Sequence, residues 1–326
     1  MRSTAILFIA VSAATSISGA VVHPVSFNSP QAFGSGQNPE CVATADLNGD
    51  GKLDLVVANT GGNTISVLLG NGNGVFKPAI EYTVGTGPAF VAIGDFNHDG
   101  KPDLAVAIEG DSNSGATVAI LLGNGDGTFR TPVDYQVGTQ PNIVAVADFN
   151  GDGKPDLAVS SLQSDTVSIL IGNGNGTFQP AQFFSTGFAA SMVVADFNGD
   201  GKPDIAVADP VDSKVSVFLG NGTGRFGPPI STVVNGSPNV MAVGDFDGDG
   251  MADLAVANST GSSVTIVIGN GDGTFLPLQA DYSLWPDLVS SIAVADFNRD
   301  GSQDLAVTGA GVAILLGKGN GAFEPR

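Results

Sequence analysis

The sequence predicts an all-β fold, a six-bladed β-propeller with four antiparallel strands per blade, and two repeated motifs carry this prediction. The motif Asp-x-(Asn/Asp)-x-Asp-Gly-x-x-Asp starts at Asp46, Asp95, Asp148, Asp196, Asp245 and Asp296 in the chain of 326 residues. A glycine-rich turn follows each copy and ends at Phe76, Phe129, Phe178, Phe226, Phe275 and Phe323. The period of about 50 residues is unbroken and shows no helical spacing, which is typical of propeller blades.

Each repeat contains four predicted strands. The first alternates larger and smaller residues and ends on Ala or Gly directly before the acidic loop, as at Ala45 and Gly94. The second follows the loop, the third matches 64–69, and the fourth starts at the motif Phe and ends near residue 85 in the first copy. The alternation indicates strands whose two faces meet different neighbours.

The two ends of the chain predict how the blades close. The last repeat stops shortly after Phe323 and therefore lacks its fourth strand, whereas residues 27–39 align with 76–88 and form a fourth strand without a blade. We expect this N-terminal strand to complete the C-terminal blade, which closes the ring and removes an exposed edge. Residues 21–326 are then a single domain of six repeats.

Residues 1–20 have the features of a signal peptide. Arg2 precedes an apolar stretch over 4–14, and small residues occupy 18–20, so we expect cleavage after Ala20. The stretch is too short for a membrane span, and no later segment reaches 18 uninterrupted apolar residues. We therefore expect a secreted protein, extracellular or held in the periplasm or at the cell surface. A buried first strand is the alternative.

Charge and cysteine content narrow the function further. The formal net charge is -20, from 12 Lys and Arg against 32 Asp and Glu, which argues against a nucleic-acid partner because phosphate binding needs clustered cations. Cys41 is the single cysteine, so no internal disulfide can form. We interpret it as a packing residue, while its pairing with another molecule stays open, and we expect a monomer.

The acidic loops predict calcium. Each offers carboxylate or amide oxygens at positions 1, 3, 5 and 9, with Gly at position 6, and Ca²⁺ takes six to eight oxygen ligands, some from carbonyls such as that of Lys52 at position 7. Position 12 is Val in all six copies, which excludes an EF-hand. The loops hold 19 of the 32 acidic residues, and such clusters repel unless a cation joins them.

We therefore predict about six Ca²⁺, one per blade, in preference to Mg²⁺ or to metal-free Asx-rich turns. The predicted ligands are Asp46, Asn48, Asp50, Asp54, Asp95, Asn97, Asp99, Asp103, Asp148, Asn150, Asp152, Asp156, Asp196, Asn198, Asp200, Asp204, Asp245, Asp247, Asp249, Asp253, Asp296, Asn298, Asp300 and Asp304.

A family resemblance follows from these motifs. Asp-Phe-Asn-Gly-Asp-Gly-Lys-Pro-Asp-Leu at 148–157 and Leu-Leu-Gly-Asn-Gly-Asp-Gly-Thr-Phe at 121–129 closely resemble the FG-GAP/VCBS repeats of integrin α-chain propellers and of many secreted bacterial proteins. The resemblance implies a Ca²⁺-bound propeller used in adhesion or ligand binding outside the cell. Integrin propellers have seven blades, and a literal Phe-Gly occurs here only at 33–34 and 226–227, so integrin partner recognition does not carry over.

The remaining residues favour binding over catalysis. The two histidines, His23 and His98, suggest no triad, and the 13 acids outside the loops are scattered over different repeat positions. We expect a binding or adhesion module, not an enzyme, with an extracellular protein or glycan as ligand. A lectin with pockets between blades is the alternative, and a hydrolase or lyase is less favoured.

Aromatic residues outside the repeat positions are candidate contacts for such a ligand. They are Phe183, Phe184, Phe188, Tyr282 and Trp285, which could stack on sugar rings or anchor a protein partner, although core packing is the favoured interpretation.

Overall fold

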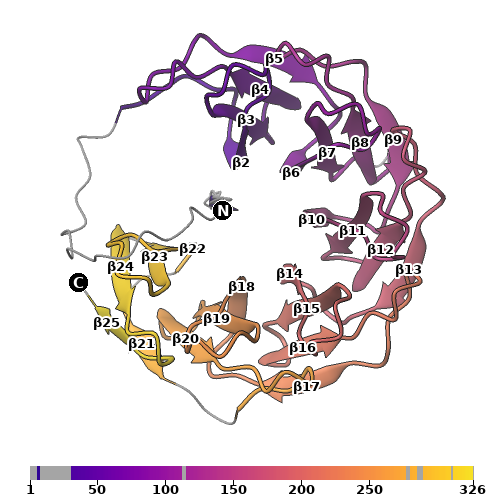
Figure 1. The fold of residues 1–326 in the computed structure, drawn as a ribbon. Helices are drawn as coiled ribbons and strands as arrows, with labels where there is room; N and C mark the ends of the chain where they lie inside the picture. Colours follow the sequence, from indigo (N-terminus) through magenta and orange to yellow (C-terminus); the bar gives the residue numbers. More distant parts are fainter. Residues whose placement is uncertain are drawn as a thin grey trace. The chain divides into compact units, whose positions relative to one another are not determined.

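The described residues form six sheets (Figure 1). Each has four antiparallel strands, and the first carries one further, parallel strand of two residues. The structure is a computed structural model and describes residues 6–7, 31–111, 115–276, 280–284, 289–309 and 311–325. Contacts divide the chain into two compact units. The predicted fold class, all-β with six four-stranded sheets, is confirmed.

The first unit contains three sheets. The first sheet consists of β1 (Ile6–Leu7), β2 (Pro39–Ala45), β3 (Asp54–Asn59), β4 (Thr64–Leu68) and β5 (Ile80–Thr83). The second consists of β6 (Pro88–Gly94), β7 (Asp103–Ile108), β8 (Thr117–Leu121) and β9 (Val133–Gln136), and the third of β10 (Pro141–Ala147), β11 (Asp156–Ser161), β12 (Thr166–Leu170) and β13 (Gln182–Ser185).

The second unit contains the other three. The fourth sheet consists of β14 (Ser191–Ala195), β15 (Asp204–Asp209), β16 (Lys214–Phe218) and β17 (Ile230–Val233). The fifth consists of β18 (Pro238–Gly244), β19 (Asp253–Asn258), β20 (Ser263–Val267) and β21 (Asp281–Ser283), and the sixth of β22 (Ser291–Ala295), β23 (Asp304–Thr308), β24 (Val312–Gly317) and β25 (Phe323–Pro325).

The two middle strands of each sheet supply most of the core. Every residue of β7, β11, β15 and β19 is buried. In the first unit, the second sheet contacts both the first and the third through β6. Covering both faces of a strand explains why these segments are continuous runs of apolar residues and not an alternation. This rigid core fixes the ends of the first and second strands, between which each acidic loop lies.

The N-terminal segment is described only in part. Ile6 and Leu7 pair in parallel with Cys41 and Val42 of β2. The rest of the predicted signal peptide, including its cleavage site, lies outside the described residues, so its removal stays a prediction. Within the described ranges, the structure contains no helix with the length and apolar character of a membrane span.

The sixth sheet corrects one detail of the sequence analysis. A fourth strand was not expected there, but β25 pairs with β24, with Phe323 opposite Gly317. This register is that of the isolated bridges in earlier copies, such as Gly70 to Phe76, extended by two residues. The outer half of β24 is uncovered, and Val312 is 65% exposed where its equivalent Ile65 is fully buried.

The predicted closing strand is therefore only partly tested. Residues 27–30 lie outside the described ranges, and residues 31–38 form no strand. Phe33 nevertheless packs edge-to-face on Phe76 at 5.2 Å between ring centroids. Fourth-strand tyrosines make the same contact, as Tyr82 does with Phe129 at 5.9 Å. The sequence alignment of this segment thus agrees with the packing of Phe33, and closure of the ring stays a prediction.

Candidate metal loops

Each acidic loop is organised by its leading aspartate. In the first loop, Asp46 Oδ1 accepts hydrogen bonds from the backbone N–H groups of Gly49 and Asp50, at 2.8 and 3.1 Å, and Oδ2 accepts from Gly51 at 2.7 Å. Gly51 has a φ of 79°, a left-handed conformation that favours glycine. These hydrogen bonds lower the pKa of Asp46, that from Gly51 most. The third loop repeats the arrangement around Asp148.

The ninth-position aspartate joins the loop to the glycine-rich turn. Asp54 is fully buried; its Oδ2 accepts from Leu47 N at 2.9 Å and its Oδ1 from Gly70 N at 2.6 Å. The same two bonds recur in all six repeats, through Asp54, Asp103, Asp156, Asp204, Asp253 and Asp304. The two sequence motifs are in phase because one carboxylate holds both.

The first glycine of the turn has no room for a side chain. A Cβ atom on Gly70 would collide with the carbonyl oxygen of Leu53, just before the buried aspartate. The equivalent collision occurs at every copy, at Gly70, Gly123, Gly172, Gly220, Gly269 and Gly317. The close approach lets the turn N–H reach the carboxylate.

A second turn, from the following repeat, braces the same loop. In the first unit, Gly127 N donates to Leu47 O at 3.1 Å and Gly176 N to Phe96 O at 2.8 Å. In the second unit, Gly273 N donates to Phe197 O at 2.9 Å. The position-2 residue of these loops is thus hydrogen-bonded through both its backbone N–H and its carbonyl oxygen, independently of any ion.

The side chains at loop positions 3 and 5 have other hydrogen-bond and ion-pair partners than the aspartates at positions 1 and 9. Asn48 Oδ1 accepts from Asp50 N at 2.9 Å, so its oxygen stays within the loop. The exposed Asp50 carboxylate lies 3.3 Å from Lys52 Nζ. The same lysine pairing occurs in the second, third and fourth loops, at 3.6, 3.0 and 2.9 Å. In these four loops the position-5 carboxylate therefore faces a cation of the chain itself.

The fifth loop brings three carboxylates together. Oxygens of Asp245, Asp247 and Asp253 all lie within 4.8 Å of one another, the one such triple among the described residues. Position 3 is Asp247 here, where the other five loops have Asn, and this supplies the third carboxylate. Position 7 is Met251, where the first four loops have Lys. Because this loop has one more carboxylate than the others and no lysine at position 7, it is the strongest candidate for a cation.

The sixth loop departs in another way. Asn298 is buried, and its Nδ2 donates to Asp300 Oδ2 at 2.8 Å, while its Oδ1 accepts from Asp300 N at 2.9 Å. The leading Asp296 is exposed. The predicted ligands at positions 3 and 5 are thus bonded to each other here.

Burial gives the ninth-position carboxylates unusual electrostatics. Burial raises the pKa of Asp156 and of Asp253 to about 6. The two backbone hydrogen bonds of each carboxylate lower its pKa, and the neighbouring loop carboxylates raise it further, but burial has the largest effect. Burial also raises the pKa of Asp103, Asp204 and Asp304. A cation would relieve both the desolvation and the repulsion. The donors are all oxygens, which suits a hard cation such as Ca²⁺.

Of the aromatic residues that were candidate ligand contacts, Tyr282 has a structural role. Tyr282 packs on Phe323 at 5.9 Å, and its Oη accepts from Phe323 N at 2.8 Å. Tyr135 does the same at Phe178, a periodic role that sequence reasoning missed. Phe183 is 56% exposed and stays a candidate contact, whereas Trp285 lies outside the described residues.

Cys41 lies in the core of the first sheet. Its side chain is buried, and burial raises the pKa of its thiol to about 12. A thiol of this kind is not ionised near neutral pH, which agrees with the predicted packing role.

A known protein family contains the same repeat. A model described as an FG-GAP-like repeat matches residues 46–106, 95–159, 148–207, 196–256 and 245–307. The chain belongs to the FG-GAP-like repeat family. Each match spans one acidic loop and the next, so the family unit contains the loop, the buried aspartate and the glycine turn described above. Among curated proteins, none matches this FG-GAP chain.

Solved structures share the fold. An Agrocybe aegerita lectin, described as recognising non-reducing terminal N-acetylglucosamine, is 23% identical with a TM-score of 0.62, over 87% of this chain and 78% of the lectin. A putative 6-phosphogluconolactonase from Bacteroides fragilis is 14% identical with a TM-score of 0.63, over 88% and 83%. A functionally unknown Desulfotomaculum acetoxidans protein is 13% identical with a TM-score of 0.61, over 89% of each chain. These likenesses support a β-propeller fold.

Proposed function

We propose that this FG-GAP propeller is a secreted binding or adhesion module whose acidic loops hold structural Ca²⁺. The buried carboxylate of each loop carries the proposal. It fixes the loop to the glycine turn in all six repeats, and in the fifth it lies beside two further carboxylates. An arrangement that recurs in every blade serves the scaffold and not one reaction centre.

The ion would be held by the loop oxygens that the structure brings together. In the fifth loop these are Asp245, Asp247 and Asp253. In the other loops, the leading and ninth-position aspartates and the side-chain oxygen at position 3 offer the corresponding donors. When bound, Ca²⁺ supplies neutralising charge to the loop. The chain's own residues supply the shape, since Asp46 folds the turn and Asp54 anchors it.

Thermal unfolding of the chain from Val21, with Ca²⁺, with Mg²⁺ and after chelation, tests this role. An ion that binds only the folded state raises the unfolding temperature by mass action. We expect a large rise that is selective for Ca²⁺. Equal unfolding temperatures in all three conditions would exclude structural calcium.

A glycan is the ligand class that we favour over a protein. The similar fold of the Agrocybe aegerita lectin supports it, as does the polar pocket described below. Binding of the calcium-loaded chain to a glycan array, with a matrix-protein array beside it, separates the two classes. Signal confined to the protein array would reject the glycan assignment and leave the calcium role standing.

We assign no catalytic role. The loop carboxylates, which form most of the acidic residues, are engaged by backbone N–H groups or lysines. This supports a non-enzymatic binding protein, and the predicted signal peptide supports its action outside the cytoplasm.

A further inference from the structure

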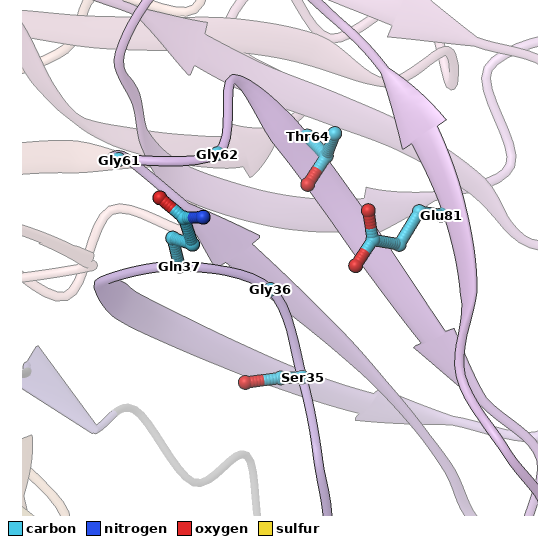
Figure 2. A pocket seen from close by; sticks show the side chains of 7 residues that line it. All are labelled: Ser35, Gly36, Gln37, Gly61, Gly62, Thr64 and Glu81. Carbon is cyan, nitrogen blue, oxygen red and sulfur yellow. The ribbon is translucent and has the colours of Figure 1, made fainter.

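A polar pocket of about 390 Å³ lies at the turn between β3 and β4 of the first sheet (Figure 2). It is lined by Ser35, Gly36, Gln37, Gly61, Gly62, Thr64 and Glu81. These residues offer two hydroxyls, one amide and one carboxylate, and the glycines expose backbone. The lining includes no aromatic ring and no cation, and it is separate from the acidic loops.

The walls of the pocket are held in place by the chain. Gly61 N donates to Gln37 O at 3.1 Å, which ties the β3–β4 turn to the segment before β2. The buried Asn59 donates from Nδ2 to Thr64 Oγ1 at 3.2 Å. The Thr64 hydroxyl thus accepts from the protein and keeps its own hydrogen for another acceptor. Such preorganisation lowers the entropic cost of binding.

In the fifth sheet, a carboxylate at the position equivalent to Glu81 has two hydrogen-bond donors from the chain. There Asp281 occupies the same register on the fourth strand. Its Oδ1 accepts from the Thr265 hydroxyl, and its Oδ2 accepts from Asn235 Nδ2 at 2.7 Å. One hydroxyl and one amide of the chain therefore satisfy this carboxylate.

The first sheet lacks the amide. Asn235 stands three residues before the proline that opens β18, and Gly36 stands three residues before the proline that opens β2. Gly36 has no side chain to offer, and its backbone lies against the Asn59 amide, where a Cβ would collide. The structure gives Glu81 no hydrogen bond to another described residue. Figure 2 shows its carboxylate pointing toward the space between Thr64 and Gly36, among the residues that line the pocket.

Ser66 occupies the register of Thr265 opposite Glu81, so only the amide donor is missing in the first sheet. We propose that this pocket binds one terminal N-acetylhexosamine of a glycan, which brings from outside the amide donor that Asn235 supplies in the fifth sheet. The proposal rests on the glycan ligand of the proposed function. The volume suits a single sugar residue. Glu81 and Gln37 accept sugar hydroxyls and the acetamide N–H, and Thr64 donates to a sugar oxygen. A lone carboxylate without a cation disfavours acidic sugars.

The test uses methyl β-N-acetylglucosaminide as the probe, titrated into the calcium-loaded chain and followed by ligand-observed NMR. We expect Glu81→Gln to weaken binding about tenfold, because it removes the charged acceptor, and Thr64→Val to weaken it as well. The matched control is Asp134→Asn, at the same register in the second sheet, with unchanged affinity expected. Methyl β-glucoside, which lacks the acetamide, should bind about tenfold more weakly.

Two results would overturn the proposal. One is an absence of sugar binding by a chain that still binds calcium; the other is sugar binding that Glu81→Gln and Thr64→Val leave intact. Binding of N-acetyl-arginine amide in preference to the sugar would identify a cationic peptide ligand instead. Calcium content is measured on the same samples. A chain that holds calcium but binds no sugar contradicts this pocket, whereas a chain that holds no calcium contradicts the proposed calcium-loaded scaffold.

Discussion

The third and fifth acidic loops have the same backbone frame but different charge. Asp156 and Asp253 make equivalent pairs of hydrogen bonds to the loop and to the glycine turn, at 2.7 to 3.0 Å. Around that frame, Lys154 Nζ lies 3.0 Å from Asp152 in the third loop, whereas the fifth has Met251 in place of the lysine. The frame is thus independent of the counter-charge, and the fifth loop depends most on an added cation.

The largest effect is expected from the buried carboxylates themselves. Asp156→Asn and Asp253→Asn each weaken two backbone hydrogen bonds, so in chelator each should cost about 2 kcal/mol of unfolding free energy, measured by urea denaturation. With Ca²⁺ present, the cost at Asp253 should grow more than that at Asp156. Asp165→Asn, an exposed left-handed turn position, is the control. Unequal costs in chelator would refute the shared frame.

A smaller effect should follow from giving the fifth loop a lysine. Met251→Lys adds a charge that competes with the ion, so the calcium affinity of this loop should fall about tenfold. This corresponds to about 1.4 kcal/mol, between the roughly 1 kcal/mol of two charges 4 Å apart in water and the roughly 4 kcal/mol of such a pair near a protein surface. Calcium titration against the wild type measures it. Unchanged affinity would show that lysine at position 7 does not distinguish the loops.

The smallest effect is expected in the reverse exchange. Lys154→Met removes an exposed ion pair, which contributes at most about 1 kcal/mol. The unfolding free energy in chelator should change little, while the third loop should bind calcium more tightly, by less than the change at Met251. Isothermal titration of the two variants side by side compares them, and weaker calcium binding by Lys154→Met would contradict the account.

The loops were predictable because their chemistry is local. The spacing of Asp46, Asp50 and Asp54 alone indicates oxygen ligands, and the period of the motif gives the six sheets. The bond from Asp54 to Gly70 was missed because sequence spacing does not reveal which N–H a carboxylate meets. The periodic recurrence of Tyr82, Tyr135 and Tyr282 was an available signal for their packing role.

The pocket could not be predicted from sequence. It depends on the register that sets Glu81 opposite β4, on the turn that brings Gly61 to Gln37, and on the lack of a side chain at Gly36. The first two are contacts between residues that are distant in sequence, and the role of Gly36 appears only when its place beside Asn59 is known. No local sequence motif marks any of the three.

The central claim, structural calcium in the acidic loops, is tested most directly by counting calcium on the native chain. Native mass spectrometry of the chain from Val21 should show about six Ca²⁺, and the Asp247→Asn variant should lose its fifth-loop ion at a higher free calcium concentration than the wild type does. A chain that carries no calcium at millimolar free Ca²⁺ would contradict the account, because extracellular sites bind at about 10⁻⁴–10⁻³ M or tighter.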